Sequence, residues 1–488
     1  MGGGAEAGLV AELYEYDAVT LAALLRGRQA SAREVTAAHI ERVRAQDGAI
    51  NAMVTRTFEQ ALTKAAAADE SLAGGAEPGL LHGLPVAHKD LVDTAGVRTS
   101  YGSLLFADHV PDRDALLVSR MSAAGAISLG KTNTPEFGAG SHTVNRVFGA
   151  TRNPYDTSRS AGGSSGGAAA ALAARMICLA DGSDLGGSLR NPASFCNVVG
   201  LRPSPGRVPA WPFTDVVDTM SVEGPMGRTV ADVALLLTVL SGADARVPLA
   251  LDAPPPPVTD PAQVPGLLAR DLRGLRVGWS ADLGLPLAPD VRAVLGPARG
   301  VLADLGCDVV DVSPDLTGAD EVFRTWRAFR FATNFGDLLR GYRDQLGPNV
   351  IWNTERGLEL TAADLRRATV LRAALAQRVS DFFATVDVLA CPATQVAAFD
   401  VELDWVHEID GVAQRTYLDW MASAYLISAT GLPAMSVPAG FTPGGLPVGL
   451  QLVGRRRADW PLLAVAHSFE AATRHAARAP VLPPVTAA

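Results

Sequence analysis

The densest run of small residues in the chain lies between positions 160 and 203, and it restricts the possible folds more than any other feature. Residues 160–167 read SAGGSSGG and residues 181–192 read DGSDLGGSLRNP, with an alanine-rich helix predicted between them. Paired glycines ahead of a serine let the backbone bend so that successive N–H groups point at one spot. A flexible linker would not contain Asp184, Leu185 and Arg190 or lead into the apolar residues 195–201. The region therefore predicts an ordered loop that gathers backbone N–H groups.

Such a loop meets the requirement of an oxyanion hole, whose donors sit about 3 Å from the developing negative charge. Ser188 ends the loop and is well placed to attack a carbonyl carbon, but a serine nucleophile also needs a base. Lys89 follows the apolar run LPVAH at 84–88, which predicts a position at the edge of a buried strand. Desolvation lowers the pKa of a lysine, so part of the population would be neutral near pH 7. None of the eight histidines has an obvious orienting acid beside it in the sequence.

Composition excludes several classes of protein. With 488 residues, 48% hydrophobic and 19% charged, the chain can bury a sizeable core. A net charge of −9 gives no excess of positive charge for binding nucleic acid. The basic cluster at 455–457 is therefore interpreted as a solvated loop. Four cysteines without a CxxC pair predict buried free thiols in a reducing compartment and no zinc cluster. Residues 1–6 lack a signal-peptide pattern, and no apolar run reaches about 18 residues, so we expect a cytoplasmic protein without a membrane span.

The pattern along the chain predicts an α/β fold with a single large mixed, twisted β-sheet covered by helices on both faces. We expect one domain over residues 1–488, with an N-terminal helical arm at 1–72 and a catalytic core at 83–210. A Pro-rich surface connector is predicted at 253–265, and a helical segment at 317–385 is expected to shape the pocket. In that segment Trp326, Phe329 and Trp352 are interpreted as core residues. Trp211 and Phe213 are the better pocket candidates.

Three short motifs match catalytic patterns in the wrong context. Residues 125–132, GAISLGKT, match a phosphate-binding P-loop, but here a helix is predicted to end near Ala124 and a strand to follow, the reverse of the required order. Residues 162–166, GGSSG, match a nucleophile elbow, yet no buried strand precedes them, and the downstream His467 is expected to be structural. Ser128 and Lys131 lack the companion motifs of the β-lactamase pattern. We interpret none of the three as the site.

Seven ordered motifs together resemble the amidase-signature family. They are PVAHKD at 85–90, GKTNTPEF at 130–137, GGSSGG at 162–167, GGS at 186–188, FCNVVGLRP at 195–203, TGLPA at 430–434 and GLPVGLQ at 445–451. The motifs extend over most of the chain and keep their order, so the resemblance is specific.

The resemblance implies a hydrolase with a Ser–cis-Ser–Lys triad and no metal or organic cofactor. Ser188 matches the nucleophile and Lys89 the base. Ser164, whose peptide bond is cis in this family, matches the serine that relays protons. The remaining positions that match are the oxyanion-loop residues Leu185, Gly186 and Gly187, which act with Ser188 through backbone N–H groups, the substrate-bordering Gly138, and the supporting polar residues Ser165, Asp184 and Arg190.

The function implied is hydrolysis of an amide-like C–N bond, in an amide, anilide or carbamate, through a Ser188 acyl-enzyme. The chain resembles stand-alone bacterial amidases, including aryl acylamidase-like and urethanase-like members. One alternative is the glutaminase component of a tRNA-dependent amidotransferase, which would need partner subunits. Another is a non-catalytic ligand-binding protein on the same fold. The expected partner is a small-molecule amide or carbamate, with no nucleic acid or membrane, and a homodimer is left open.

Overall fold

The computed structural model describes residues 13–213 and 215–482. Residues 1–6, on which the expectation about a signal peptide falls, lie outside this range. Three helices begin the described chain: α2 (Ala18–Arg26), α3 (Ala32–Ile50) and α4 (Phe58–Ala73). A capping box begins α3, because the Ser31 side chain accepts the N–H of Glu34 and the Glu34 side chain accepts the N–H of Ser31.

A strand, β1 (Met53–Arg56), interrupts the helical arm predicted at 1–72. Helix α3 ends at Ile50, and its C-cap residue Asn51 adopts the left-handed conformation with φ of 58°. The chain then extends, and β1 pairs with the strand at Ile127–Thr132. The partner lies more than 70 residues away, so no local periodicity in the sequence indicated this strand.

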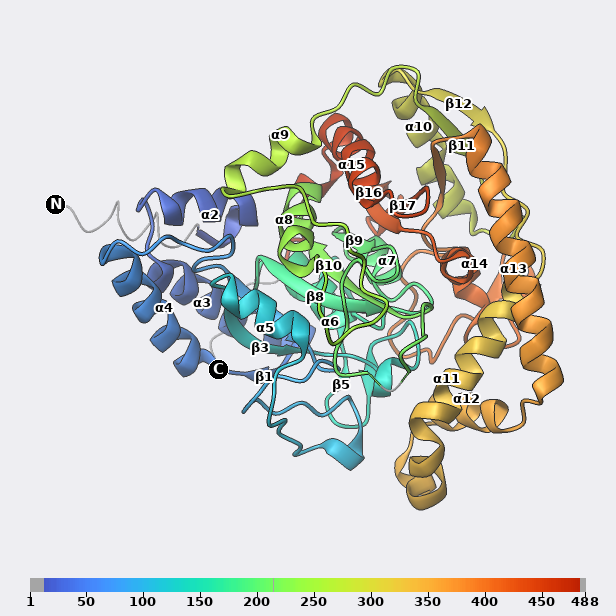
Figure 1. Cartoon of the computed structure of the whole chain (residues 1–488), viewed down its shortest axis with the longest axis horizontal. Coiled ribbons are helices and arrows are strands. Elements are labelled where there is room, and N and C mark those ends of the chain that lie inside the picture. Colours follow the sequence, from blue (N-terminus) through green and yellow to red (C-terminus); the bar gives the residue numbers. More distant parts are fainter. Residues whose placement is uncertain (1–12, 214, 483–488) are drawn as a thin grey trace.

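One mixed sheet runs through the described part of the molecule, with eleven strands in the order β1-β3-β2-β8-β10-β9-β16-β17-β13-β11-β12 (Figure 1). Strand β2 is parallel to both β3 and β8, whereas β10 is antiparallel to β8 and β9. At the other end β11 is parallel to β12 and β13. The remaining strands of the sheet are β2 (Pro85–Lys89), β3 (Ile127–Thr132), β8 (Leu179–Asp184), β9 (Val199–Arg202), β10 (Val222–Gly227), β11 (Arg276–Trp279), β12 (Asp308–Asp311), β13 (Val388–Pro392), β16 (Ala434–Phe441) and β17 (Pro447–Gly454).

Helices cover both faces of this sheet, as predicted. Helices α6 (Gly166–Ala173) and α7 (Arg190–Phe195) pack on one face, and α8 (Val230–Leu240) and α15 (Asp459–Thr473) on the other. Every residue of strand β2 and of the alanine-rich helix α6 is buried. The other helices of the first half and the middle are α5 (Leu116–Ala123), α9 (Val264–Leu268) and α10 (Pro289–Asp304). Short strand pairs flank the sheet: β4 (Val144–Asn145) with β5 (Gly149–Ala150), β6 (Arg152–Asn153) with β7 (Asp156–Ser160), and β14 (Glu408–Ile409) with β15 (Val412–Ala413).

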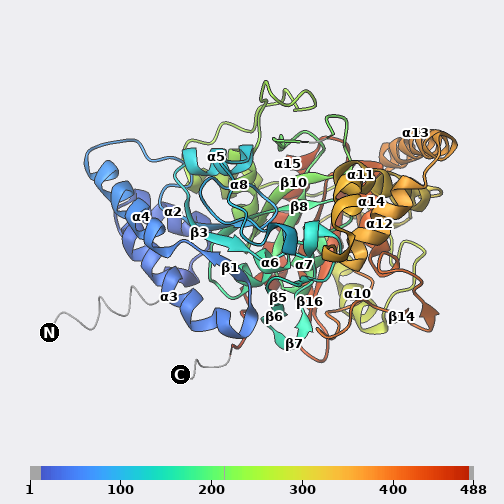
Figure 2. The ribbon, with the colours of Figure 1, turned by 90° about the horizontal axis from the view of Figure 1, so that it is seen from below.

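The N-terminal helices and the later helices lie at opposite ends of the sheet (Figure 2). The later group contains α11 (Ala319–Tyr342), α12 (Pro348–Leu358), α13 (Ala362–Thr385) and α14 (Ala422–Thr430). The helical character predicted for 317–385 is therefore confirmed. Among the described residues, no helix combines the length and the apolar character needed to cross a membrane.

Candidate active site

Lys89 is the last residue of β2, the third strand of the sheet, and its side chain is completely buried. Its Nζ lies 2.7 Å from Ser164 Oγ, 2.9 Å from Ser165 Oγ and 3.1 Å from Ser183 Oγ. Ser164 and Ser165 directly precede α6, whereas Ser183 belongs to β8. The two small-residue segments of the sequence therefore converge on one amine.

The environment of Lys89 favours the uncharged amine. Burial lowers the pKa of Lys89 from 10.5 to about 7, because the ammonium form loses its hydration. The charges of Asp181 and Asp184, and that of Glu223 when it is ionised, act in the opposite direction and raise the pKa, but less strongly. A pKa near 7 leaves a large neutral fraction at neutral pH, so this amine can accept a proton.

Asp184, at the end of β8, organises the loop that follows it. Its carboxylate accepts the N–H of Gly187 at 2.9 Å and the N–H of Leu189 at 3.2 Å. Arg190 binds the same carboxylate through Nε at 3.0 Å and Nη2 at 2.9 Å. Burial would raise the pKa of Asp184, but the charges of Arg190 and Arg202 outweigh it and hold the pKa well below its usual range.

Arg190 ties this loop to the C-terminal half of the chain. Its Nη1 donates to the carbonyl of Ala424 at 2.9 Å and to Gln451 Oε1 at 2.5 Å, and its Nη2 donates to Ser428 Oγ at 2.7 Å. These partners lie in α14 and β17, on or next to the motifs that begin near residues 430 and 445. The distant motifs of the sequence therefore meet at the loop before Ser188, and Arg190 supports the loop's position.

The backbone N–H groups of residues 185–188 differ in whether they already have a hydrogen-bond acceptor. That of Gly187 is used by Asp184. Across the described residues, those of Leu185, Gly186 and Ser188 donate to no protein acceptor. The sequence predicted four donors for a developing oxyanion, and the structure leaves three of them free to bind one.

Ser188 is 8% exposed and lies beside the serines before α6. The N–H of Ser165 donates to the Ser188 carbonyl at 3.2 Å. In the part of the chain that the structure describes, no hydrogen bond joins the hydroxyls of Ser164 and Ser188. Lys89 Nζ thus bonds directly to the Ser164 hydroxyl. It reaches Ser188 only through Ser165, whose hydroxyl contacts Nζ and whose backbone N–H donates to the Ser188 carbonyl. The Gly163–Ser164 peptide bond is cis.

Gly138 lies directly in front of Ser164. Its φ is +72°, a backbone conformation that suits glycine. A Cβ at this position would sit 3.4 Å from Ser164 Oγ and 3.1 Å from Leu91 Cδ1. The absence of a side chain therefore leaves space next to the Ser164 hydroxyl.

The structure corrects one inference about the histidines. His88 has an acid partner after all, because its Nδ1 lies 2.6 Å from Asp181 Oδ2. The other oxygen of Asp181 accepts the backbone N–H of Lys89 at 3.0 Å. Asp181 is 93 residues from His88 in sequence, which is why no local pattern showed the pair. The pair fixes the end of β2, from which Lys89 extends.

Lys131, the lysine of the P-loop-like motif, is also buried but has a structural setting. Its Nζ donates to the carbonyl of Val92 and, at 2.9 Å, to Thr94 Oγ1. Helix α5 ends at Ala123 and β3 follows at Ile127–Thr132, so the reversed order predicted for this motif is confirmed. His467 lies on α15, where its buried Nδ1 has no hydrogen-bond partner among the described residues.

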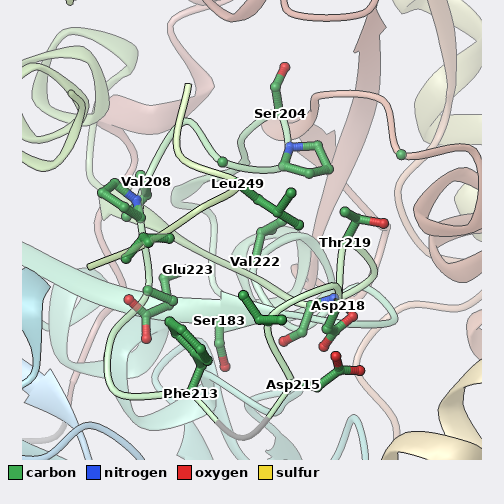
Figure 3. Close-up of a pocket in the computed structure, with 18 of the residues that line it drawn as sticks. Ser183, Ser204, Val208, Phe213, Asp215, Asp218, Thr219, Val222, Glu223 and Leu249 are labelled. Atoms are coloured by element: carbon green, nitrogen blue, oxygen red, sulfur yellow. Dashed lines mark hydrogen bonds between the residues drawn. The ribbon is translucent and has the colours of Figure 1, made fainter. Parts of the chain in front are cut away.

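A cavity of about 850 Å³ adjoins this centre on the side of Lys89. Ser183 and Glu223, from the adjacent strands β8 and β10, line its inner end, and Asp218 and Thr219 come from the loop ahead of β10 (Figure 3). Burial raises the pKa of Glu223 to about 8. Sequence reasoning missed Glu223, since a single glutamate in a strand carries no motif.

The aromatic residues that the sequence placed in the pocket (Trp211, Phe213) or in the core (Trp326, Phe329, Trp352) fall into different environments. Phe213 lines the 850 Å³ cavity. Trp211 instead packs under Arg246, whose guanidinium lies 4.5 Å from the ring centroid. Trp326 packs partly buried against the core and meets Phe329 edge to face, whereas Trp352 also lines a separate pocket of about 60 Å³. Within the described residues, no cluster of three or more His, Cys, Asp and Glu side chains is arranged to hold a metal ion, and the four cysteines are buried free thiols.

Comparison with known proteins identifies the class of this chain. The profile of the Amidase family matches residues 34–463. The chain is 37% identical to the A-type component of the glutamyl-tRNA(Gln) amidotransferase of Moorella thermoacetica, over 96% of this chain and 99% of that one. It is 36% identical to an acylamidase of Rhodococcus erythropolis, over 94% and 96% of the two chains.

Solved structures show the same architecture. A bacterial aryl acylamidase of the amidase-signature enzymes superposes with a TM-score of 0.87 at 28% identity, covering 96% of this chain and 99% of that one. The 6-aminohexanoate cyclic dimer hydrolase in complex with its substrate gives a TM-score of 0.85 at 29% identity, with coverage of 96% and 99%. Fold and relatives together define an enzyme that hydrolyses amide C–N bonds. The chain belongs to the amidase family, with the amidase-signature fold, and the alternative of a non-catalytic binding protein is not supported.

Proposed function

We propose that this enzyme cleaves amides, with anilides and carbamates among its substrates, through an acyl-enzyme on Ser188. The observation that carries the proposal is the buried Lys89 amine, whose pKa is lowered to about 7 and whose Nζ lies 2.7 Å from Ser164 Oγ. A neutral amine in contact with a serine hydroxyl can take a proton from it.

In the proposed reaction, Ser188 Oγ forms a bond to the substrate carbonyl carbon. Its proton passes to Ser164 Oγ, and the proton of Ser164 passes to Lys89 Nζ. This transfer requires the Ser188 and Ser164 hydroxyls to come within hydrogen-bond distance in the substrate complex. Catalytic hydrogen bonds that are long in a free enzyme commonly shorten in that complex. The carbonyl oxygen takes up the negative charge and is held by the free N–H groups of Leu185, Gly186 and Ser188.

The same groups then transfer protons in the opposite direction, from Lys89 to the substrate. The C–N bond breaks, and the leaving nitrogen takes a proton from Ser164, which recovers one from the Lys89 ammonium. Water next attacks the acyl carbon and gives a proton to Ser164, which passes its own to Lys89. The bond between the acyl carbon and Ser188 Oγ then breaks, Ser188 Oγ takes a proton back from the relay, and the acid leaves. Asp184 and Arg190 hold the loop, and Ser165 and Ser183 fix the amine of Lys89.

The experiment uses a panel of small amides, anilides, carbamates, esters and glutamine with wild type, Ser188→Ala and Lys89→Ala. We expect both variants to lose nearly all turnover. Ser194 provides the matched control, since it is also buried in the same region but binds Thr394 and the N–H of Gly449. A serine-directed phosphonate should label wild type and Ser194→Ala at Ser188, as located by mass spectrometry. Substantial turnover by Ser188→Ala would overturn the nucleophile assignment.

A second candidate is the glutaminase component of a tRNA-dependent amidotransferase, favoured by the 37% identity to the Moorella thermoacetica protein. It predicts that glutamine is the best substrate and that its hydrolysis depends on partner chains. Efficient anilide or carbamate hydrolysis by the isolated protein, with negligible glutaminase activity, would exclude it. Light scattering on the same preparation measures the mass of the particle and tests whether the chain forms a homodimer.

A further inference from the structure

The 850 Å³ cavity meets the reaction centre on the side of the base. Ser183, in its wall, is bonded to Lys89 Nζ, and Leu91, also in its wall, flanks Gly138 together with Ser164 Oγ. Ser188 is not among the residues that line it. In the proposed mechanism the leaving nitrogen receives its proton from Ser164 and Lys89. The cavity therefore lies on the side from which the leaving nitrogen would be protonated.

The walls of the cavity are largely apolar, with side chains from distant parts of the chain. Leu91, Val208, Phe213, Val222 and Leu249 contribute to them. Such walls suit an aromatic or aliphatic leaving group rather than ammonia. The charged residues then decide which such group fits.

Four arginines line the cavity, and their charges are compensated to different degrees. Arg330 forms an ion pair with Asp218. Arg372 donates to Thr219 Oγ1 at 2.7 Å. Desolvation lowers the pKa of Arg372, the charge of Asp218 raises it in part, and the charge of Arg456 lowers it further. Across the described residues, Arg456 and Arg457 form no hydrogen bond or ion pair.

The neighbouring Arg455 does have bonding partners, so the lack of partners at Arg456 and Arg457 is not shared by the whole basic cluster at 455–457. It forms an ion pair with Asp387 at 2.8 Å, donates to the carbonyl of Val386, and does not line the cavity. All three arginines of 455–457 are exposed, in keeping with the solvated loop that the sequence predicted. Two of the three arginines line the cavity that adjoins the reaction centre.

The balance of charge in the cavity is positive. Of its three acids, Asp218 is paired with Arg330, and the raised pKa of Glu223 keeps most of it uncharged at neutral pH. Asp215 remains, against the cations of Arg372, Arg456 and Arg457. An anionic group would bring these guanidinium groups the partner that they lack.

We propose that the cavity binds the leaving-group half of the substrate and that Arg456 and Arg457 select amides whose amine portion carries an anionic group, such as a carboxylate. This inference rests on the proposed function, because it uses the direction of proton delivery from Lys89. It names a substrate class: N-acylated amino carboxylates, which release a carboxylate-bearing amine.

Three anilides test the proposal. In 3-acetamidobenzoate the anion is on the leaving group, in succinanilic acid it is on the acyl group, and 3-acetamidoacetophenone is neutral. Relative to wild type, Arg456→Gln/Arg457→Gln should lower kcat/KM for 3-acetamidobenzoate about fivefold, in keeping with exposed charge pairs. The other two substrates should change less than twofold. Arg455→Gln is the matched control and should leave all three ratios unchanged.

A binding measurement keeps this inference separate from the catalytic one. Calorimetry with Ser188→Ala should detect 3-aminobenzoate, the leaving amine, and binding should weaken about fivefold when Arg456 and Arg457 are also replaced, or in high salt. Equal losses for succinanilic acid, equal losses in Arg455→Gln, or no detectable binding would each overturn the anion subsite. Persistent turnover by Ser188→Ala would instead overturn the proposed function.

Discussion

Replacing Lys89 with methionine should remove activity and at the same time change how stability depends on pH. The pKa of Lys89 falls from 10.5 in the unfolded chain to about 7 in the fold. At neutral pH and below, that difference corresponds to a cost of about 5 kcal/mol for burying the group. Methionine has a similar length and no charge, so the variant does not carry this cost.

The sign follows from the number of protons bound. Between pH 7 and pH 10.5 the unfolded wild-type chain holds a proton on Lys89 that the folded chain has released. Wild type therefore gains stability as pH rises through this window, whereas the variant lacks the group. Between pH 8 and pH 10 the free energy of unfolding of wild type should rise relative to Lys89→Met by about 1.4 kcal/mol per pH unit, or about 3 kcal/mol in all.

Denaturant unfolding at pH 8, 9 and 10 measures this difference, and all other titrating groups are common to the two proteins. Wild-type kcat/KM should rise with pH and level off above about 7, as Lys89 loses its proton. A difference in unfolding free energy that stays constant from pH 8 to pH 10 would show that Lys89 is an ordinary ammonium. Such an ammonium could not serve as the base of the proposed reaction.

Other changes test the surroundings of the site. Gly138→Ala should lower kcat at least tenfold and cost about 1–2 kcal/mol of stability, because the methyl group would lie 3.4 Å from Ser164 Oγ on a residue with positive φ. Steady-state kinetics and thermal melts measure the two effects, and an unchanged kcat would contradict the prediction. Asp184→Asn should destabilise the fold by roughly 3–5 kcal/mol, since it leaves the buried Arg190 and Arg202 without their counter-charge; a denaturation curve that matches wild type would refute this role. All four cysteines are buried free thiols, so a disulfide-exchange reagent should react rapidly with none in the native protein and with four after unfolding.

Local patterns predicted those parts of the site that depend on a few neighbouring residues. The apolar run before Lys89 predicted a strand, and β2 is a fully buried strand that ends at that lysine. The glycines before Ser188 predicted a loop that gathers N–H groups, and three such groups are free there among the described residues. The predictions failed where the partner is remote. Strand β1 forms by pairing with β3, and His88 binds an aspartate 93 residues away.

By itself, the sequence determined which residues could do the chemistry, because a strand end, a glycine loop and a serine pair are properties of short segments. Only the tertiary structure decided what those segments face. The order of the strands brings Ser183 and Glu223 to one wall, and α11, α13 and the loop after β17 place arginines around it. These contacts join segments far apart in the chain, and the energy that fixes them comes from burial of the whole core rather than from any local motif. Which guanidinium groups find a partner and which are left to bind a ligand is therefore visible only in the folded chain.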